Sequence, residues 1–226
     1  MQRKSVVLGV LTTVIGVSLA VHAWAFPQYA RQTKLACVTC HANPAGGADL
    51  KAAGKAFKAD MTKAPAADTA KAAEYVGINK CKMCHLKQYK EWHETRHASA
   101  LVNLQKADAK AAADMSAKLK VELKGSPAQT EGCVGCHVTG FHLAGGYPAA
   151  DSAKTAAVSN MTCEGCHGPG SLHAAAPVAM KKTLINKAVS ANMCMQCHTA
   201  VTSPAFKFEE YAKRGVHVVA VAAPAK

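Results

Sequence analysis

Residues 163–167 read CEGCH, and this C-x-x-C-H pattern occurs five times in the chain. The other copies start at Cys37, Cys81, Cys133 and Cys194. Two cysteines three positions apart lie on one face of a helical turn, so each copy brings two thiols and the next histidine together. The five copies contain all ten cysteines of the 226-residue chain, which indicates one chemical unit used five times.

The C-x-x-C-H pattern is typical of the covalent attachment of c-type haem. Its two thiols form thioethers with the two vinyl groups of one porphyrin, and its histidine becomes the proximal ligand of the iron. Zinc sites do not require a histidine directly after a C-x-x-C pair, and disulfides require no fixed spacing. A redox-active dithiol is disfavoured because the same sulfur cannot be in a thioether and a disulfide. The sequence therefore predicts five covalently attached haem c groups.

The residues that this prediction assigns fall into two sets. The attachment residues are Cys37, Cys40, Cys81, Cys84, Cys133, Cys136, Cys163, Cys166, Cys194 and Cys197. The proximal iron ligands are His41, His85, His137, His167 and His198.

Five further histidines follow residue 25, and their number equals the number of motifs; they are His93, His97, His142, His173 and His217. The equality predicts that each iron takes a second imidazole, which leaves no open position for a substrate. The alternative is that one or two of them are surface residues, with an open iron or a Met61 ligand in compensation.

Spacing and periodicity indicate where some of these rings are directed. His142 and His173 follow their nearest proximal histidines by five and six residues. A fully extended chain of that length reaches only about 17 to 21 Å, too short to round a porphyrin easily, so both are expected to serve neighbouring haems. Residues 86–104 are predicted to form a helix with His93 and His97 on one face. His93 alone also fits a helix-surface histidine beside Trp92.

Residues 1–25 have the three parts of a secretory signal: Arg3 and Lys4, an apolar run, and Ala23-Trp24-Ala25 as a cleavage site. An uncleaved membrane anchor is the alternative, but the apolar run is shorter than the about 20 residues that a span requires. We therefore expect a periplasmic or secreted protein without a stable membrane span after cleavage. The formal net charge of +13 fits an acidic redox protein partner, while the absence of an Arg-rich block argues against nucleic acid.

The expected fold is mainly α with extensive loops, in which short helices wrap around covalently bound haems with little or no sheet. Aromatic residues make up only 5% of the chain, so the macrocycles are expected to supply much of the buried apolar area. Residues 62–73 are predicted to link a one-haem segment, 26–68, to a four-haem part, 69–226. Residues 106–120, rich in Ala, Lys and Leu, are expected to form a helix.

From residue 75 onward the chain resembles the tetrahaem cytochrome c-554 family. The resemblance rests on residues 75–77, 88–98, 136–141 and 163–173, and the similar part covers about two-thirds of the chain. It implies electron transfer as the function, and it implies that His97 and His173 are distal ligands to haems other than their own. The segment that begins at Cys37 is an addition to the family pattern.

These observations predict an exported pentahaem protein that carries single electrons from a membrane oxidoreductase to a downstream acceptor. A membrane quinol oxidoreductase is one such donor. No catalytic residue is predicted. One alternative is a multihaem oxidoreductase that acts on small nitrogen compounds. The other is self-assembly into an extracellular cytochrome filament, in which His217 or His93 ligates a haem of the next subunit.

Overall fold

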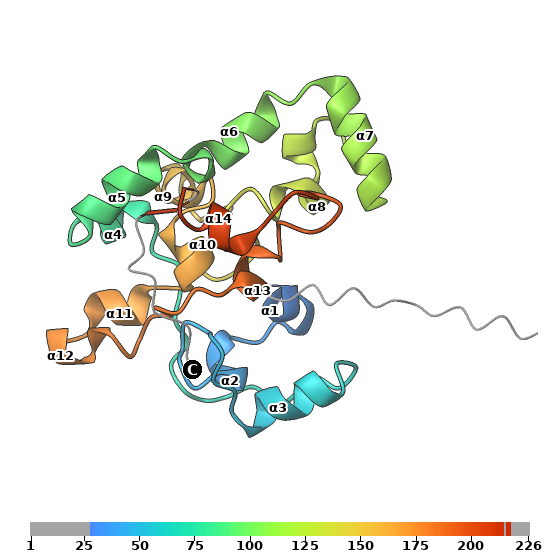
Figure 1. Cartoon of the computed structure of the whole chain (residues 1–226). Helices are drawn as coiled ribbons and strands as arrows, with labels where there is room; N and C mark the ends of the chain where they lie inside the picture. Colours follow the sequence, from blue (N-terminus) through green and yellow to red (C-terminus); the bar gives the residue numbers. More distant parts are fainter. Residues whose placement is uncertain (1–27, 215, 218–226) are drawn as a thin grey trace, which may run out of the picture.

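The computed structural model describes residues 28–214, 216 and 217, which form short helices joined by loops (Figure 1). The predicted secretory signal lies outside these described residues. The helices in chain order are α1 (Gln28–Thr33), α2 (Cys37–Cys40), α3 (Ala52–Ala59), α4 (Ile78–Lys82), α5 (Leu86–His93), η1 (Arg96–Ser99), α6 (Ala100–Gln105), α7 (Ala109–Leu119), η2 (Pro127–Gln129), α8 (Glu131–Val134), α9 (Ser152–Val158), α10 (Cys163–His167), α11 (Ser171–Ala175), α12 (Val178–Lys181), α13 (Ala191–Cys194) and α14 (Phe208–Tyr211).

Extended pairing in the described part of the chain is confined to one antiparallel bridge between His41 and Leu50. The predicted fold class, mainly α with little sheet, is therefore confirmed. No helix within residues 28–214 has the length and the apolar character needed to cross a membrane.

The helix predicted over residues 106–120 is confirmed as α7, Ala109–Leu119, the longest helix that the structure describes. Asp108 begins it by accepting hydrogen bonds from the main-chain N–H groups of Lys110 and Ala111, at 2.9 and 3.0 Å. Lys120 ends it in the left-handed conformation, with φ 53°.

The single helix predicted over residues 86–104 is wrong, because the segment is divided into α5, η1 and α6. Thr95 is extended, with φ −93° and ψ 161°, and its hydroxyl donates to the carbonyl oxygen of Trp92 at 2.7 Å. A threonine hydroxyl that satisfies the last carbonyls of a helix competes with its continuation. His93 and His97 therefore lie on different helices and do not share one face.

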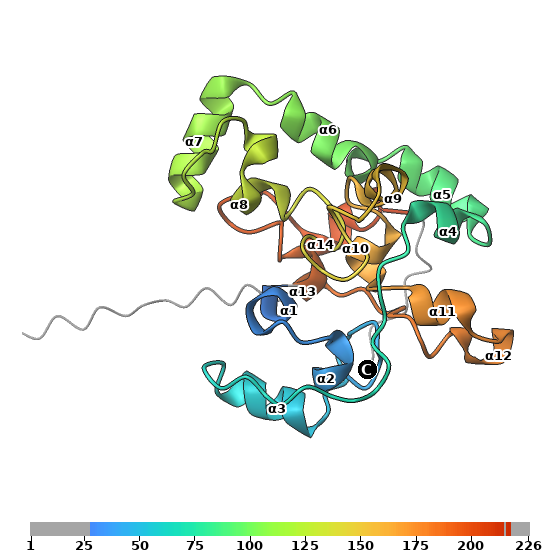
Figure 2. The ribbon, with the colours of Figure 1, turned by 180° about the vertical axis from the view of Figure 1, so that it is seen from behind.

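The apolar core is small. Its main cluster comprises Leu101, Val134, Val138 and Phe141, with Tyr147 packed against it. Helices α2 and α3 lie at one end of the molecule and α5, α6 and α7 at the opposite end, in the front view and from behind (Figures 1 and 2). The attachment motifs lie on the short helices between and around these ends.

Residues 62–73, predicted to be a linker, contain no helix or strand. The segment before them nevertheless packs against the later chain. The amide of Asn43 donates to the carbonyl oxygen of Ile185 at 3.0 Å. Gly168, with φ +79°, lies so close to Ala45 that a Cβ there would overlap the Ala45 carbonyl oxygen. Only glycine fits both this backbone conformation and this approach.

Candidate haem-binding sites

Each C-x-x-C-H motif lies on a tight helical turn, as its spacing predicts. In three motifs, the main-chain N–H of the histidine donates a hydrogen bond to the main-chain carbonyl oxygen of the first cysteine. These bonds join His41 to Cys37 at 2.9 Å, His85 to Cys81 at 3.0 Å and His198 to Cys194 at 2.9 Å. In the fourth motif, α10 runs from Cys163 to His167 and contains all five residues. None of the ten cysteines is in a disulfide, so each turn presents two sulfurs and an imidazole for haem attachment.

Hydrogen bonds at Nδ1 orient two of the proximal imidazoles through main-chain carbonyl oxygens. His137 Nδ1 lies 2.8 Å from the Ala100 carbonyl oxygen, and His167 Nδ1 lies 2.6 Å from that of Asn186. Such a bond fixes the ring and leaves Nε2 for a metal. Burial lowers the pKa of His167 below its ordinary value, which favours the neutral imidazole that binds iron.

Three proximal histidines face a second imidazole. The ring centroids are 6.1 Å apart for His85 and His173, 6.0 Å for His97 and His198, and 5.9 Å for His167 and His217. An imidazole nitrogen lies about 2 Å from a metal that it ligates and the ring centroid about 1 Å farther, so two imidazoles across one iron have centroids about 6 Å apart. The residues present therefore fit bis-histidine haem iron at three of the five motifs.

Each facing ring comes from a segment that follows a different motif. His173 lies on α11, after the fourth motif, and faces the histidine of the second motif. Its ring is held by a 2.8 Å contact from Nδ1 to the carbonyl oxygen of Lys181. His97, after the second motif, faces the fifth, and His217, after the fifth, faces the fourth. His173 thus lies near the histidine of a motif other than its own, and ligation of a neighbouring haem by it stays a prediction.

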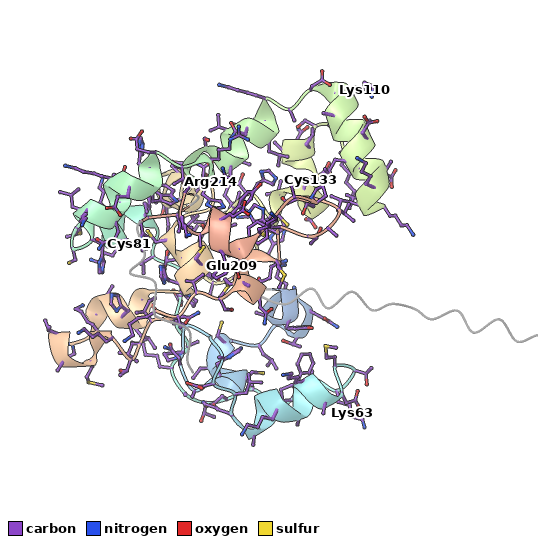
Figure 3. The ribbon with its side chains drawn as sticks, viewed as in Figure 1. Lys63, Cys81, Lys110, Cys133, Glu209 and Arg214 are labelled. Atoms are coloured by element: carbon purple, nitrogen blue, oxygen red, sulfur yellow. The ribbon has the colours of Figure 1, made fainter. Side chains whose placement is uncertain are left out.

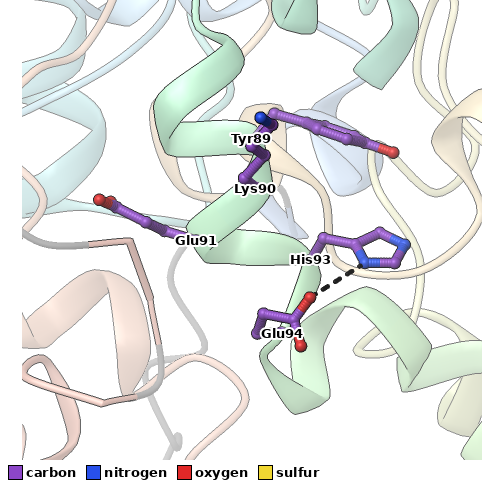
Figure 4. A pocket seen from close by; sticks show the side chains of 5 residues that line it. All are labelled: Tyr89, Lys90, Glu91, His93 and Glu94. Carbon is purple, nitrogen blue, oxygen red and sulfur yellow. Dashed lines mark ion pairs between the residues drawn. The ribbon is translucent and has the colours of Figure 1, made fainter.

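The structure does not bring the other two candidate histidines into such pairs. His142 Nε2 lies 3.3 Å from a carboxylate oxygen of Glu131, and its ring packs on Phe141 with centroids 4.0 Å apart. His93 is exposed, and its Nδ1 lies 3.7 Å from Glu94 (Figure 4). Iron ligation by these two histidines stays a prediction.

Met61, the alternative axial ligand, accepts a hydrogen bond from the Tyr29 hydroxyl at 3.0 Å through its sulfur. It therefore lies beside α1, and ligation by it also stays a prediction.

Thiols of different motifs are neighbours. The side chain of Cys81 lies beside that of Cys163, and the side chain of Cys136 lies beside that of Cys197. Cys81 is part of α4 and Cys133 is part of α8, and α10 lies between these two helices in the shared view of Figures 1 and 3. The second motif thus adjoins the fourth, and the third adjoins the fifth.

Sequence reasoning missed Glu164, a buried carboxylate inside the fourth motif. It accepts main-chain hydrogen bonds from Val76 at 2.9 Å, Gly77 at 2.7 Å and Gly170 at 2.7 Å. It therefore ties the chain that enters the second motif to the fourth motif. Burial raises the pKa of Glu164 above its ordinary value, although the three N–H donors oppose this. Glu164 occupies one of the two variable positions of the C-x-x-C-H motif, so the motif itself does not indicate that this residue is a buried hydrogen-bond acceptor.

Sequence reasoning also missed Arg31 on α1. Its guanidinium lies 6.0 Å from the ring centroid of Phe141, and it interacts electrostatically with Cys136 and Cys197. Burial lowers the pKa of Arg31 below its ordinary value. The N-terminal segment thus places a cation between the third and fifth motifs.

Comparison with known proteins gives matches to cytochromes. Residues 80–168 match the family model described as cytochrome c554 and c-prime. Cytochrome c-554 of Nitrosomonas europaea is 41% identical over 102 residues, which are 43% of this chain and 40% of that relative. The solved structure of the reduced state of cytochrome c554 from Nitrosomonas europaea aligns with a TM-score of 0.48 at 25% identity, over 64% of this chain and 85% of that one.

The matched segment contains three of the five motifs, those that begin at Cys81, Cys133 and Cys163. The first and fifth motifs lie outside it. The central part of this chain is thus similar to cytochrome c554, and the chain spans less than half the length of the curated relative that it matches.

Proposed function

We propose that this chain is an exported five-haem cytochrome that carries single electrons. The observation that carries the proposal is the set of three facing histidine pairs, each with ring centroids about 6 Å apart, on motifs that would attach haem c. Haem c, when bound, supplies reversible one-electron chemistry between ferric and ferrous iron.

The residues of the chain suit a carrier because they hold both sides of the metal position. His85 and His173 would occupy the two axial positions of one iron, and the same reasoning applies to the other two pairs. An iron with two imidazoles has no vacant position for a substrate. The Nδ1 hydrogen bonds fix these rings, so little rearrangement accompanies a change of oxidation state.

The neighbouring thiols support a continuous route for electrons. Cys81 adjoins Cys163, Cys136 adjoins Cys197, and Cys166 interacts electrostatically with Cys194. The motifs are therefore adjacent in the order second, fourth, fifth, third. The first motif would add a fifth site through the segment 26–68, which we propose as a one-haem unit before the four-haem part, 69–226.

Partners and location follow from the predicted secretory signal and the charge. We propose a periplasmic or secreted protein that takes electrons from a membrane quinol oxidoreductase and passes them to a redox protein. Because the haem propionates would offset much of the formal net charge of +13, an acidic partner would be recognised only through local basic patches.

The test is a measurement of haem content and spin state on the exported holoprotein. Mass spectrometry of the intact protein is expected to give five haem additions, and electron paramagnetic resonance to give mainly low-spin ferric signals. His173→Ala is expected to convert one low-spin signal to high spin, because it removes the ring that faces His85. Lys110→Ala, at an exposed side chain of α7, is the control and is expected to leave the spectrum unchanged. Fewer than five additions, or a low-spin spectrum unaffected by His173→Ala, would contradict the proposal.

One observation favours a second candidate function, the chemistry of small nitrogen compounds. In the part of the chain that the structure describes, no ring contact joins His137 to another histidine. An iron held by His137 with a free sixth position would bind nitric oxide or hydroxylamine. A high-spin ferric signal in the wild-type protein that disappears on addition of nitric oxide is the expected result for this function. A wholly low-spin spectrum excludes it.

A further inference from the structure

Arg31 is half-buried and holds a positive charge at the junction of two attachment motifs. Its Nη2 atom lies beside Gly135, inside the third motif, 4.0 Å from the position that a Cβ on this glycine would take. It interacts electrostatically with Cys136 of that motif and with Cys197 of the fifth. Its Cζ lies 6.0 Å from the centre of the Phe141 ring. The cation therefore belongs to the surroundings of the third and fifth motifs, although the N-terminal segment supplies it.

Among the residues that the structure describes, no carboxylate is found to interact with this guanidinium. Its Nη1 is buried and makes no hydrogen bond to any residue that the structure describes. An arginine side chain keeps its proton at every pH at which proteins are folded. A half-buried charge acts over a longer range than a fully exposed one, because less solvent screens it.

We propose that Arg31 raises the reduction potential of the haem iron attached through the third motif. It raises the potential of the haem iron attached through the fifth motif to a lesser degree. This inference rests on the proposed function, since it concerns the same haem sites. Reduction adds one electron to a ferric centre, with no bond broken and no proton moved, and so lowers the positive charge of that centre by one. A fixed cation nearby makes this change more favourable.

The opposite end of the motif array has the opposite charge. Glu164 lies in the fourth motif and interacts electrostatically with Cys81 of the second. The main-chain N–H groups of Val76, Gly77 and Gly170, together with Lys154, favour the ionised carboxylate, whereas burial opposes it. Electrons that enter at the second and fourth motifs are therefore drawn toward the third and fifth. The N-terminal segment, by supplying Arg31, helps to set this direction.

The experiment is a spectroelectrochemical titration of the five-haem holoprotein as wild type and as Arg31→Gln, in the presence of one-electron mediators. Arg31→Gln is expected to lower the equilibrium constant for reduction of the highest-potential haem about tenfold, which is about 59 mV for one electron. Arg96→Gln, which removes an exposed arginine, is the control and is expected to leave every potential within a twofold change in equilibrium constant.

Haem number and spin state are measured on the same samples. Unchanged potentials in Arg31→Gln, with five haems and an unaltered low-spin spectrum, overturn this inference and leave the proposed function intact. A wild-type protein with fewer haems contradicts the proposed function instead. A shift of the same size in Arg96→Gln also overturns the inference, because it would reflect total charge and not the position of Arg31.

Arg31→Lys keeps the positive charge but replaces the guanidinium by an ammonium group. It provides a second test, which can still be made if Arg31→Gln does not assemble with its haems. It is expected to retain the wild-type potentials at neutral pH. At high pH the substituted lysine, buried at this site, loses its proton, and the highest potential then falls in Arg31→Lys while it does not fall in the wild type. Equal pH dependence of this potential in the two proteins overturns the inference.

Discussion

Replacement of Glu164 by alanine tests whether this carboxylate joins the second and fourth motifs. The change leaves the main-chain N–H groups of Val76, Gly77 and Gly170 without their acceptor. A buried N–H that loses its partner costs about 1 to 3 kcal/mol, so three of them correspond to about 3 to 9 kcal/mol. Removal of a buried carboxylate also relieves its own desolvation, which opposes this loss. We therefore expect the lower end of the range, a decrease of about 3 kcal/mol in the free energy of unfolding.

The assay is guanidinium denaturation of the holoprotein at pH 7, followed by circular dichroism, with haem content measured on the same samples. Glu122→Ala is the matched control, since Glu122 is exposed, and it is expected to change the free energy of unfolding by less than about 0.5 kcal/mol. A loss of less than about 1 kcal/mol in Glu164→Ala would refute the reasoning, because it would mean that the three N–H groups find other partners.

The same pair of proteins gives a pH dependence. Burial raises the pKa of Glu164 in the folded protein above its ordinary value of 4.5. An acid with a raised folded pKa adds most to stability below its unfolded pKa, and this part is lost as the pH rises through the folded value. The stability difference between wild type and Glu164→Ala is therefore expected to decrease as the pH rises above 4.5. A difference that increases over this range would show that the N–H donors outweigh burial.

Three further substitutions test separate contacts. Gly168→Ala is expected to destabilise the protein by about 2 kcal/mol or more in denaturant titrations, because it combines a positive φ with an overlap on Ala45; a loss below about 0.5 kcal/mol contradicts the close approach. Asp68 accepts a hydrogen bond from Lys51 at 2.8 Å, which lowers its pKa below 3.8, so its contribution is present above that pH and lost as the pH falls. Asp68→Asn should abolish this part of the acid dependence of unfolding, and an unchanged acid profile argues against the pair. Trp92→Phe removes the indole hydrogen bond to a main-chain carbonyl oxygen at 2.9 Å, and it is expected to lower the free energy of unfolding by about 1 kcal/mol in the same denaturation. An unaltered denaturation midpoint would contradict this contribution.

The local parts of the candidate sites could be predicted from the sequence, because they depend on neighbouring residues. A C-x-x-C-H motif fixes its own helical turn, and α10 contains the whole of one motif as expected. The helix over Ala109–Leu119 could be predicted for the same reason, since its composition and its N-terminal aspartate act locally.

The partners of the proximal histidines could not be predicted, since they are brought together by long-range folding. Counting gave five candidate rings for five motifs, but nothing in the sequence distinguishes His217, which faces His167, from His142, which contacts Glu131. The division of residues 86–104 at Thr95 was missed because a helical hydrophobic pattern continues across it. Arg31 and Glu164 were missed because their roles depend on burial, which a single charged letter does not indicate.

The facing of His167 by His217 makes the middle of the chain depend on its end. His217 follows His167 by 50 residues and lies beyond the last attachment motif, so the site at His167 stays incomplete until this later segment has folded against it. A chain truncated before His217 would keep every attachment motif and still lack this ring. Such a truncation would thus leave a protein of normal colour with one altered iron, a defect that haem staining does not detect and magnetic spectroscopy does.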